Sequence, residues 1–362
     1  MSVLSRILPP PIYMAVPSVG VDISDTSLKY FSFKPTAHED RERELQQWGD
    51  IDIPSGIVEK GQVHDLEKLV SILKEFKAQT NSEFINVSLP EERAYVFETE
   101  VRRNIPMKEI RGLLEFKLEE NVPIPSKDVL FDYEILPNHH DEKTAQVVVV
   151  AYARETIQHY YDACIEAGLR PVSFEVEAQA VARAMIPKDI KGTTMLVDFG
   201  KTRTGIGIVF DGYLLNTSTI DIGGEALSQA LRKVVDPNTS EAQLTILKNT
   251  QGLIREVDSF SVHNALIAII SVIKDELVTR MQYWHIRNNN QDDRRINSIV
   301  LCGGSSNLKG LSSYLTDSIG IPCVQGNVWE NSFSLDHNIP PIDRNHSFGY
   351  ATAIGLALRK NL

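Results

Sequence analysis

Cysteine is scarce in this sequence, and the few cysteines form no pattern. Cys164, Cys302 and Cys323 are widely separated and odd in number, which argues against a disulfide framework and for reduced thiols in a cytosolic protein. None of them has metal-ligand spacing, and the pair His139 and His140 has no further Cys or His nearby to complete a site. We therefore expect neither disulfides nor a zinc-type metal centre.

The sequence also lacks an excess of positive charge and any long apolar run. Lys and Arg number 37 against 48 Asp and Glu, a net charge of -11, whereas a nucleic-acid binder normally carries a basic face. No apolar run reaches the roughly 18 residues of a membrane-spanning helix. Arg6 and Pro9 interrupt the first apolar stretch too early for a signal peptide. We expect a cytoplasmic protein without a membrane span and without a nucleic-acid partner.

What is present is a short pattern that occurs twice. Residues 19–29 and 196–205 each read as an apolar strand ending in Asp, a tight turn of small residues, and an apolar return strand. Backbone N–H groups in such turns can approach a phosphate, because little side-chain bulk intervenes. A single copy is equally a plain β-hairpin. Two related copies suggest two lobes that grip one nucleotide from both sides.

A third glycine-rich turn lies late in the chain. The apolar strand 298–302 runs into Gly303, Gly304 and Ser305, and leucines at helical spacing follow. A strand-to-helix turn of this kind can receive a nucleotide at the helix N-terminus. With 362 residues, 42% of them hydrophobic, the chain can bury two lobes. The three turns therefore predict one site that both halves of the fold build.

These turns, in this order and followed by a helix in the segment 347–355, resemble the actin-like ATPase superfamily and, within it, the PilM family of type IV pilus assembly proteins. Other matching segments are 105–125, 131–136, 166–171, 173–184 and 220–225. The resemblance covers roughly residue 16 to the C-terminus. It implies an α/β, actin-like ATPase fold: two lobes of mixed sheet with flanking helices and an inserted α+β subdomain of the 1C type.

The resemblance also implies a division of the chain. The expected parts are 16–89 and 172–192 for the core of lobe one, 90–171 for the inserted 1C-like subdomain, 193–223 and 296–362 for the core of lobe two, and 224–295 for its outer subdomain. Apolar spacing predicts helices over 65–80, 107–121 and 154–167.

The nucleotide site is expected at the three turns. Asp22 and Asp198 are expected to hold Mg²⁺ through water, because Mg²⁺ keeps several waters and prefers carboxylate oxygen; the alternative is that each caps a turn. The residues expected to bind ATP are Ser24, Thr26, Ser27, Lys29, Gly200, Lys201, Thr202, Gly224, Glu225, Lys274, Gly303, Gly304 and Ser305.

A carboxylate that positions water is expected near residue 175. Glu175 is the catalytic candidate and Glu177 the second, although either could instead be a residue favoured at a helix N-terminus. Asp25 departs from the family pattern by adding negative charge beside the phosphates, and Lys201 can offset it. We expect ATP binding with Mg²⁺, and hydrolysis that is slow or gated.

The function implied by the resemblance is that of an ATP-binding scaffold in the inner-membrane assembly platform of a type IV pilus, or of a related secretion or competence system. The implied partner is the cytoplasmic N-terminal peptide of a PilN-like bitopic membrane protein, docked between the inserted module and lobe one. Leu113, Phe116 and Leu118 are candidates for that groove or for the core of the module. The chain would then be peripheral to the inner membrane through this partner, and self-association stays open.

Two alternatives remain at this point. An FtsA-like, membrane-tethered filament protein would end in an amphipathic helix, and we see none at the end of this sequence. A small-molecule kinase of the same superfamily would need an acceptor site, and we find no separate motif for one.

Overall fold

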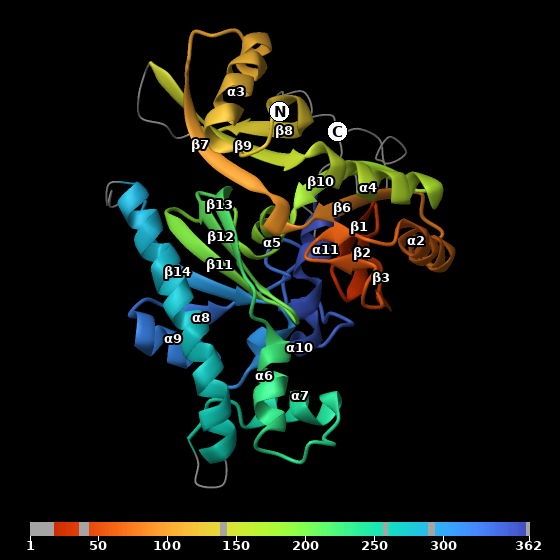
Figure 1. Ribbon diagram of the computed structural model, residues 1–362, viewed down its shortest axis with the longest axis vertical. Helices are drawn as coiled ribbons and strands as arrows, with labels where there is room; N and C mark the ends of the chain where they lie inside the picture. Colours follow the sequence, from red (N-terminus) through yellow and green to blue (C-terminus); the bar gives the residue numbers. More distant parts are fainter. Residues whose placement is uncertain (1–17, 36–42, 138–142, 256–259, 289–293, 360–362) are drawn as a thin grey trace.

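The computed structural model describes residues 18–35, 43–137, 143–255, 260–288 and 294–359 (Figure 1). It has two lobes, each built on a five-stranded sheet, and a third, three-stranded sheet above them. His139 and His140 lie outside the described residues. Cys164, Cys302 and Cys323 are buried, free cysteines.

Lobe one carries a mixed sheet in the order β10-β6-β1-β2-β3. Its strands are β1 (Val19–Ile23), β2 (Ser27–Phe33), β3 (Leu45–Asp52), β6 (Phe84–Leu89) and β10 (Arg170–Val176), and the short hairpin β4 (Val58–Glu59) and β5 (Gln62–Val63) lies beside it. β1 and β2 are antiparallel, whereas β6 pairs with β1 and with β10 in parallel. Every residue of β1 is buried, so its sequence is a short apolar run and does not alternate with polar residues.

Among the described residues, four helices flank the sheet of lobe one. They are α2 (Leu66–Thr80), α4 (Arg154–Glu166), α5 (Glu177–Met185) and α11 (Ala351–Ala357). Asp65 caps α2 by accepting a hydrogen bond from the Lys68 N–H at 3.0 Å. α11 lies so close to β1 that a Cβ on Gly20 would be 2.1 Å from the Ala353 carbonyl oxygen. Only glycine allows this approach of helix to strand.

Lobe two repeats the arrangement of lobe one, in the order β13-β12-β11-β14-β15. Its strands are β11 (Thr193–Phe199), β12 (Thr204–Phe210), β13 (Tyr213–Ile220), β14 (Ile296–Cys302) and β15 (Cys323–Gln325). Its helices are α6 (Gly224–Arg232), α7 (Glu241–Thr250), α8 (Phe260–Arg287), the 3₁₀ turn η6 (Gly304–Asn307) and α9 (Leu311–Ile319). As in lobe one, an antiparallel hairpin, here β11 and β12, is extended by a parallel strand, β14.

The third sheet forms a small module between β6 and β10 in the sequence. Its strands, in the order β7-β9-β8, are β7 (Tyr95–Arg102), β8 (Val129–Ile135) and β9 (Thr144–Ala153), with the helix α3 (Met107–Asn121) and the 3₁₀ turns η2 (Glu91–Arg93) and η3 (Ser126–Asp128). Leu118 is buried in the module's own core, whereas Leu113 and Phe116 are 40% and 75% exposed. In Figure 1 the module stands above both lobes.

The end of the chain returns to lobe one. After β15 the chain passes through α10 (Arg344–Ser347) and η7 (Phe348–Tyr350) into α11, which packs on α5 and β1. The ring centroids of Trp329 and of Phe31 in β2 are 5.7 Å apart, and Trp329 also stacks on Phe333. This differs from the expectation that 296–362 belongs wholly to lobe two: Val328 onwards contributes to the core of lobe one.

Candidate nucleotide site

The two hairpins present a pair of aspartates, one from each lobe: Asp22 is buried and Asp198 is half-buried. Asp22 of β1 accepts a hydrogen bond from the Ser88 hydroxyl at 2.9 Å. Burial raises its pKa, against the opposing charge of Lys29. Burial and then the charge of Asp22 raise the pKa of Asp198 of β11 to about 6. The two carboxylates are therefore within electrostatic reach of each other, and a divalent cation between them would relieve their repulsion.

The first turn is held by its own hydroxyl groups. The Ser24 hydroxyl donates to the Ser27 carbonyl oxygen at 2.9 Å, and Lys29 donates from Nζ to the Ser27 hydroxyl at 2.6 Å. The Thr26 carbonyl oxygen accepts from the Ile53 N–H at 3.0 Å. Serine supports this turn because its hydroxyl bonds a local backbone group. The Lys29 ammonium group lies at the turn, beside the Ser27 hydroxyl.

The second turn is joined to two other glycine segments. The Gly224 N–H donates to the Gly200 carbonyl oxygen at 3.0 Å, and the Glu225 N–H donates to that of Lys201 at 2.9 Å. The Ser305 hydroxyl also donates to the Gly200 carbonyl oxygen, at 2.9 Å. A Cβ on Gly224 would lie 2.1 Å from the Ser305 hydroxyl oxygen. The three segments thus meet at one place, with Thr202 in the loop beside them.

The third turn contains two glycines with opposite surroundings. Gly303 has φ +80°, and a Cβ there would lie 2.3 Å from the Asp198 Oδ1, so a side chain is excluded by both backbone conformation and space. Gly304 has no atom within 4 Å of where its Cβ would be. The open side of this turn is therefore the side of Gly304.

Two lysines of lobe two differ in their contacts. Lys274 on α8 forms an ion pair with its neighbour Asp275, and its role in nucleotide binding stays a prediction. Lys248 on α7 instead donates to the Ser228 hydroxyl at 2.9 Å and reaches the Gly224 carbonyl oxygen at 3.5 Å. Nothing in the sequence around Lys248 marks it, because α7 meets α6 only through the tertiary fold.

The catalytic candidate Glu175 forms ion pairs with two arginines. Arg183 donates to it from both guanidinium nitrogens, and Arg359 lies 3.0 Å from its Oε1. A carboxylate held in two ion pairs is less available to position water, and the catalytic role of Glu175 stays a prediction. Glu177 lies nearer to those turns, with its Oε1 3.7 Å from the Arg203 Nη2.

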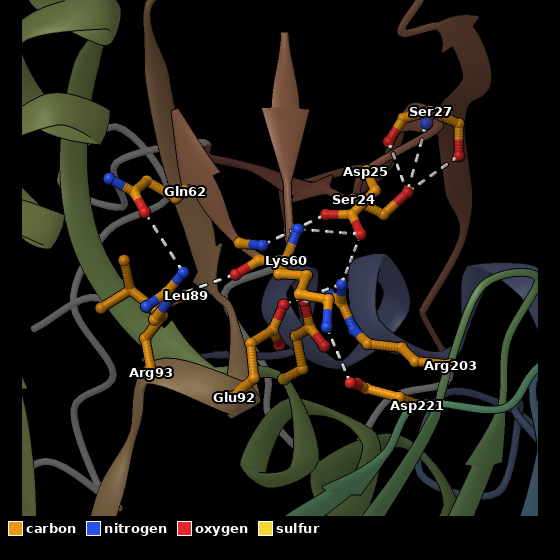
Figure 2. Close-up of polar contacts among 12 residues, drawn as sticks. Ser24, Asp25, Ser27, Lys60, Gln62, Leu89, Glu92, Arg93, Arg203 and Asp221 are labelled. Atoms are coloured by element: carbon orange, nitrogen blue, oxygen red, sulfur yellow. Dashed lines mark hydrogen bonds and ion pairs between the residues drawn. The ribbon is translucent and has the colours of Figure 1, made fainter. Parts of the chain in front are cut away.

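Arg203 of the second turn joins the two lobes, and sequence reasoning missed it. Its Nη1 lies 2.9 Å from the Asp25 Oδ2 of the first turn and 2.8 Å from the Glu92 Oε1 of η2. Figure 2 shows this guanidinium between the two carboxylates. Lys60 and Asp221 form a second, exposed ion pair between the lobes at 2.8 Å. In the sequence, Arg203 is one more polar residue of a turn, with its partners at distant positions.

A separate cavity of about 740 Å³ lies where the module, lobe one and the start of β13 meet. Its lining combines aromatic, aliphatic and charged side chains, among them Phe131, Tyr133, Val150, Tyr152, Phe174, Glu175, Arg183, Tyr213, Leu214 and Arg359. The strands β8 and β10, each at the edge of its own sheet, both contribute to this lining. The groove candidates Leu113, Phe116 and Leu118 do not line it.

A group of metal-ligating side chains and a membrane-spanning helix are both absent from the described residues. In the described parts of the chain, no three His, Cys, Asp or Glu side chains form a group that could hold a metal ion by themselves. Across the same residues, no helix is both long enough and apolar enough to cross a membrane.

Comparison with known proteins agrees with this geometry. The family model "Type IV pilus assembly protein PilM" matches residues 20–361. Among solved structures, a PilM-PilN type IV pilus biogenesis complex superposes with a TM-score of 0.76 at 22% identity, over 96% of this chain and 99% of that one. MreB5 of Spiroplasma citri bound to ADP gives a TM-score of 0.52 at 12% identity, over 89% and 94% of the two chains.

One curated relative shares part of the sequence. The cell division protein FtsA of Bacillus subtilis (strain 168) is 23% identical over 221 residues, which is 53% of this chain. The chain spans about half the length, 49%, of that relative.

The fold is that of the actin-like ATPases, with two lobes of mixed sheet and an inserted module. Because the family model covers nearly the whole chain, the protein belongs to the PilM family of type IV pilus assembly proteins. Both expectations from the sequence are confirmed.

Proposed function

We propose that this protein binds Mg²⁺-ATP between its two lobes. The observation that carries the proposal is the meeting of Gly200, Gly224 and Ser305 next to the paired aspartates. Asp22 and Asp198 would hold the cation, the two hairpin turns the phosphates, and the side of Gly304 the adenosine. The MreB5 relative is a protein bound to ADP, which supports the same use of this fold.

Bound Mg²⁺ would neutralise phosphate charge and orient the terminal phosphate for attack by water. The chain itself supplies little to activate that water, since Glu175 is tied to Arg183 and Arg359 and Glu177 lies beside Arg203. We therefore expect slow hydrolysis, with binding and release of the nucleotide as the working events. The nucleotide would then act mainly on the relative position of the lobes.

We further propose that the 740 Å³ cavity receives the cytoplasmic N-terminal peptide of a PilN-like membrane protein. The cavity has the size and mixed lining of a binding site. The edge strands β8 and β10 border it, and edge strands can pair with an extended peptide through main-chain hydrogen bonds. The solved relative is described as a PilM-PilN complex. This contact would bring a cytoplasmic chain to the inner-membrane pilus platform.

The nucleotide proposal is tested by thermal unfolding with Mg²⁺-ATP. Ligand at about a hundred times its dissociation constant should stabilise the wild type by roughly 2.7 kcal/mol. Gly304→Val should abolish this gain without unfolding the chain, because the new side chain has space in the fold but enters the open side of the turn. Gly112→Val on α3, where space is also open, is the matched control and should keep the full gain. A wild type that gains nothing from millimolar Mg²⁺-ATP refutes the proposal.

The partner proposal is tested by calorimetry with the synthetic peptide and by flotation with liposomes. Peptide binding without flotation supports attachment through a partner. Flotation on lipid alone, with no affinity for the peptide, supports an FtsA-like tether instead. Strong stimulation of ATP consumption by one sugar or carboxylate would support the kinase alternative.

A further inference from the structure

Arg203 occupies an unusual place, because it is a cation of lobe two surrounded by anions of lobe one. Its three partners are Asp25 in the first turn, Glu92 in η2 and Glu177 at the start of α5. All four side chains are only 15% exposed. One guanidinium thus faces three carboxyl groups, and burial raises the pKa of Glu92 and of Glu177.

The cluster is incompletely satisfied by hydrogen bonds. Among the described residues, both carboxylate oxygens of Glu92 and the Oε1 of Glu177 are buried without a hydrogen-bond partner. Glu91, next to Glu92, is 5% exposed, and its Oε2 also lacks a hydrogen bond. That oxygen lies only 2.5 Å from where a Cβ on Gly205 would be, so Glu91 points from lobe one into the sheet of lobe two. Buried carboxylate oxygens that have an ion-pair contact but no hydrogen bond are only partly compensated for the loss of water, which marks this arrangement as one that a ligand can change.

Asp25, by contrast, is held in place from its own lobe. Its carboxylate accepts hydrogen bonds from the backbone N–H groups of Lys60 and Gly61, both at 3.2 Å, as Figure 2 shows for Lys60. When the lobes separate, Asp25 keeps these partners and Arg203 loses its own. Arg203 is therefore the member of the cluster whose partners depend on the lobes being closed.

We propose that Arg203 is a phosphate-binding residue. Its guanidinium pairs with the carboxylates of lobe one until a nucleotide enters. Arg203 lies in the second phosphate turn, three residues after Gly200, and a guanidinium forms strong paired hydrogen bonds with phosphate. The terminal phosphate of ATP takes the place of Asp25 and Glu92 as its partner. This inference rests on the proposed function, and it explains how the site tolerates Asp25 beside the phosphates.

The proposal predicts opposite changes in Mg²⁺-ATP affinity for variants of Glu92 and of Arg203. Glu92→Gln weakens the hold on Arg203 and should tighten Mg²⁺-ATP binding at least 3-fold. Arg203→Gln removes the phosphate ligand and should weaken Mg²⁺-ATP binding at least 10-fold, and ADP binding by less, because ADP lacks the terminal phosphate. Lys233→Gln on the exposed end of α6 is the charge-matched control for Arg203→Gln.

The experiment is calorimetric titration of the full chain with Mg²⁺-ATP and with Mg²⁺-ADP. If Arg203→Gln does not fold, Arg203→Lys keeps the charge but loses the paired hydrogen bonds, and it should still lower the ratio of ATP to ADP affinity. A wild type that binds neither nucleotide defeats the proposed function and this inference with it. A wild type that binds ATP while Arg203→Gln or Arg203→Lys keeps the same ATP-to-ADP ratio overturns the inference alone. A Glu92→Gln variant with weaker binding also overturns it.

Discussion

Two buried arginines of lobe two reach across to the rest of the molecule, and they do so in different ways. Arg294 lies beneath the inserted module, where it donates to the Gln146 side-chain oxygen at 2.6 Å, faces Glu98 at 3.4 Å and stacks 4.1 Å from the centroid of Phe210. Arg203 lies at the second hairpin turn among three carboxyl groups. Arg294 has one carboxylate partner and a ring to pack on, whereas Arg203 faces three carboxyl groups from the other lobe.

The difference indicates which contact is permanent. Opening the Arg294–Glu98 pair leaves Glu98 buried without this cation, and the Arg294 Nη1 has no hydrogen-bond partner among the described residues. Arg203 can instead exchange its carboxylate partners for a phosphate, because a guanidinium forms paired hydrogen bonds with either group. We infer that the module stays attached to lobe two through Arg294, while the phosphate turns rearrange around Arg203.

The largest effect is expected at Arg294. Arg294→Ala should lower the free energy of unfolding by about 3–5 kcal/mol, because it strands Glu98 in the interior. Arg295→Ala, at the exposed neighbouring position, should change it by less than about 0.5 kcal/mol. Denaturant unfolding of both variants measures this. Equal, small losses would show that the module is not held by this contact.

The next largest effect is a difference in stability between variants of the two glycines of the third turn. Gly303→Ala should cost about 1–3 kcal/mol, since alanine at φ +80° is strained and its Cβ meets Asp198. Gly304→Ala should cost less than about 0.5 kcal/mol, since its Cβ enters open space. The pair is compared by thermal unfolding without nucleotide. If Gly304→Ala lowers the melting temperature more than Gly303→Ala does, the turn does not open on the side of Gly304.

A pH effect is expected from Glu91 at the phosphate turns. Burial and then the charge of Asp198 raise its pKa to about 8, from 4.5. The folded chain therefore holds this proton more tightly than the unfolded chain, and the free energy of unfolding falls as pH rises from 4.5 to about 8. Asp198, with a pKa of about 6, acts in the same direction at lower pH.

Glu91→Gln removes the contribution of Glu91 to the change in the free energy of unfolding with pH. The variant should be more stable than the wild type at pH 8.5, by on the order of 1–3 kcal/mol, and the gain should shrink toward pH 5. Glu115→Gln, an exposed change on α3, is the control. Urea unfolding at pH 5, 6.5 and 8.5 measures the slopes. Parallel curves for Glu91→Gln and the wild type would show that Glu91 is already ionised in the folded protein.

The smallest effect concerns the cavity beneath the module. Tyr213 lines it, whereas Tyr283 on α8 is 63% exposed and does not. Tyr213→Ala should weaken binding of the PilN-like peptide about 10-fold, or roughly 1.4 kcal/mol, because interface tyrosines commonly dominate binding. Tyr283→Ala should leave it unchanged. Calorimetry measures the peptide affinity of both variants. Equal affinities would show that the peptide does not bind in this cavity.

Local patterns predicted much of the fold and part of the site. The helix predicted at 107–121 has those bounds, and the glycine turns around Gly200 and Gly303 lie together. These features depend on spacing within a few residues, which sequence displays directly. The paired aspartates also came from a repeated local motif.

Features that depend on distant segments were missed. Arg203 meets Asp25 across 178 residues, and no local pattern distinguishes it from other turn residues. Glu175 and Glu177 are two residues apart in sequence, yet Glu175 pairs with Arg183 and Arg359, whereas Glu177 lies beside Arg203 of the second turn. The return of α11 to lobe one is likewise a result of packing on β1, with no signal in the helix itself.

The central claim is that one nucleotide is held by turns from both lobes. Its most direct test is calorimetric titration of Mg²⁺-ATP into the wild type and into Asp22→Asn and Asp198→Asn, which alter one lobe each. We predict one site per chain, loss of most of the affinity when Mg²⁺ is chelated, and at least 10-fold weaker binding in each variant. Wild-type affinity in either variant would contradict a site shared between the lobes, as would a wild type that does not bind.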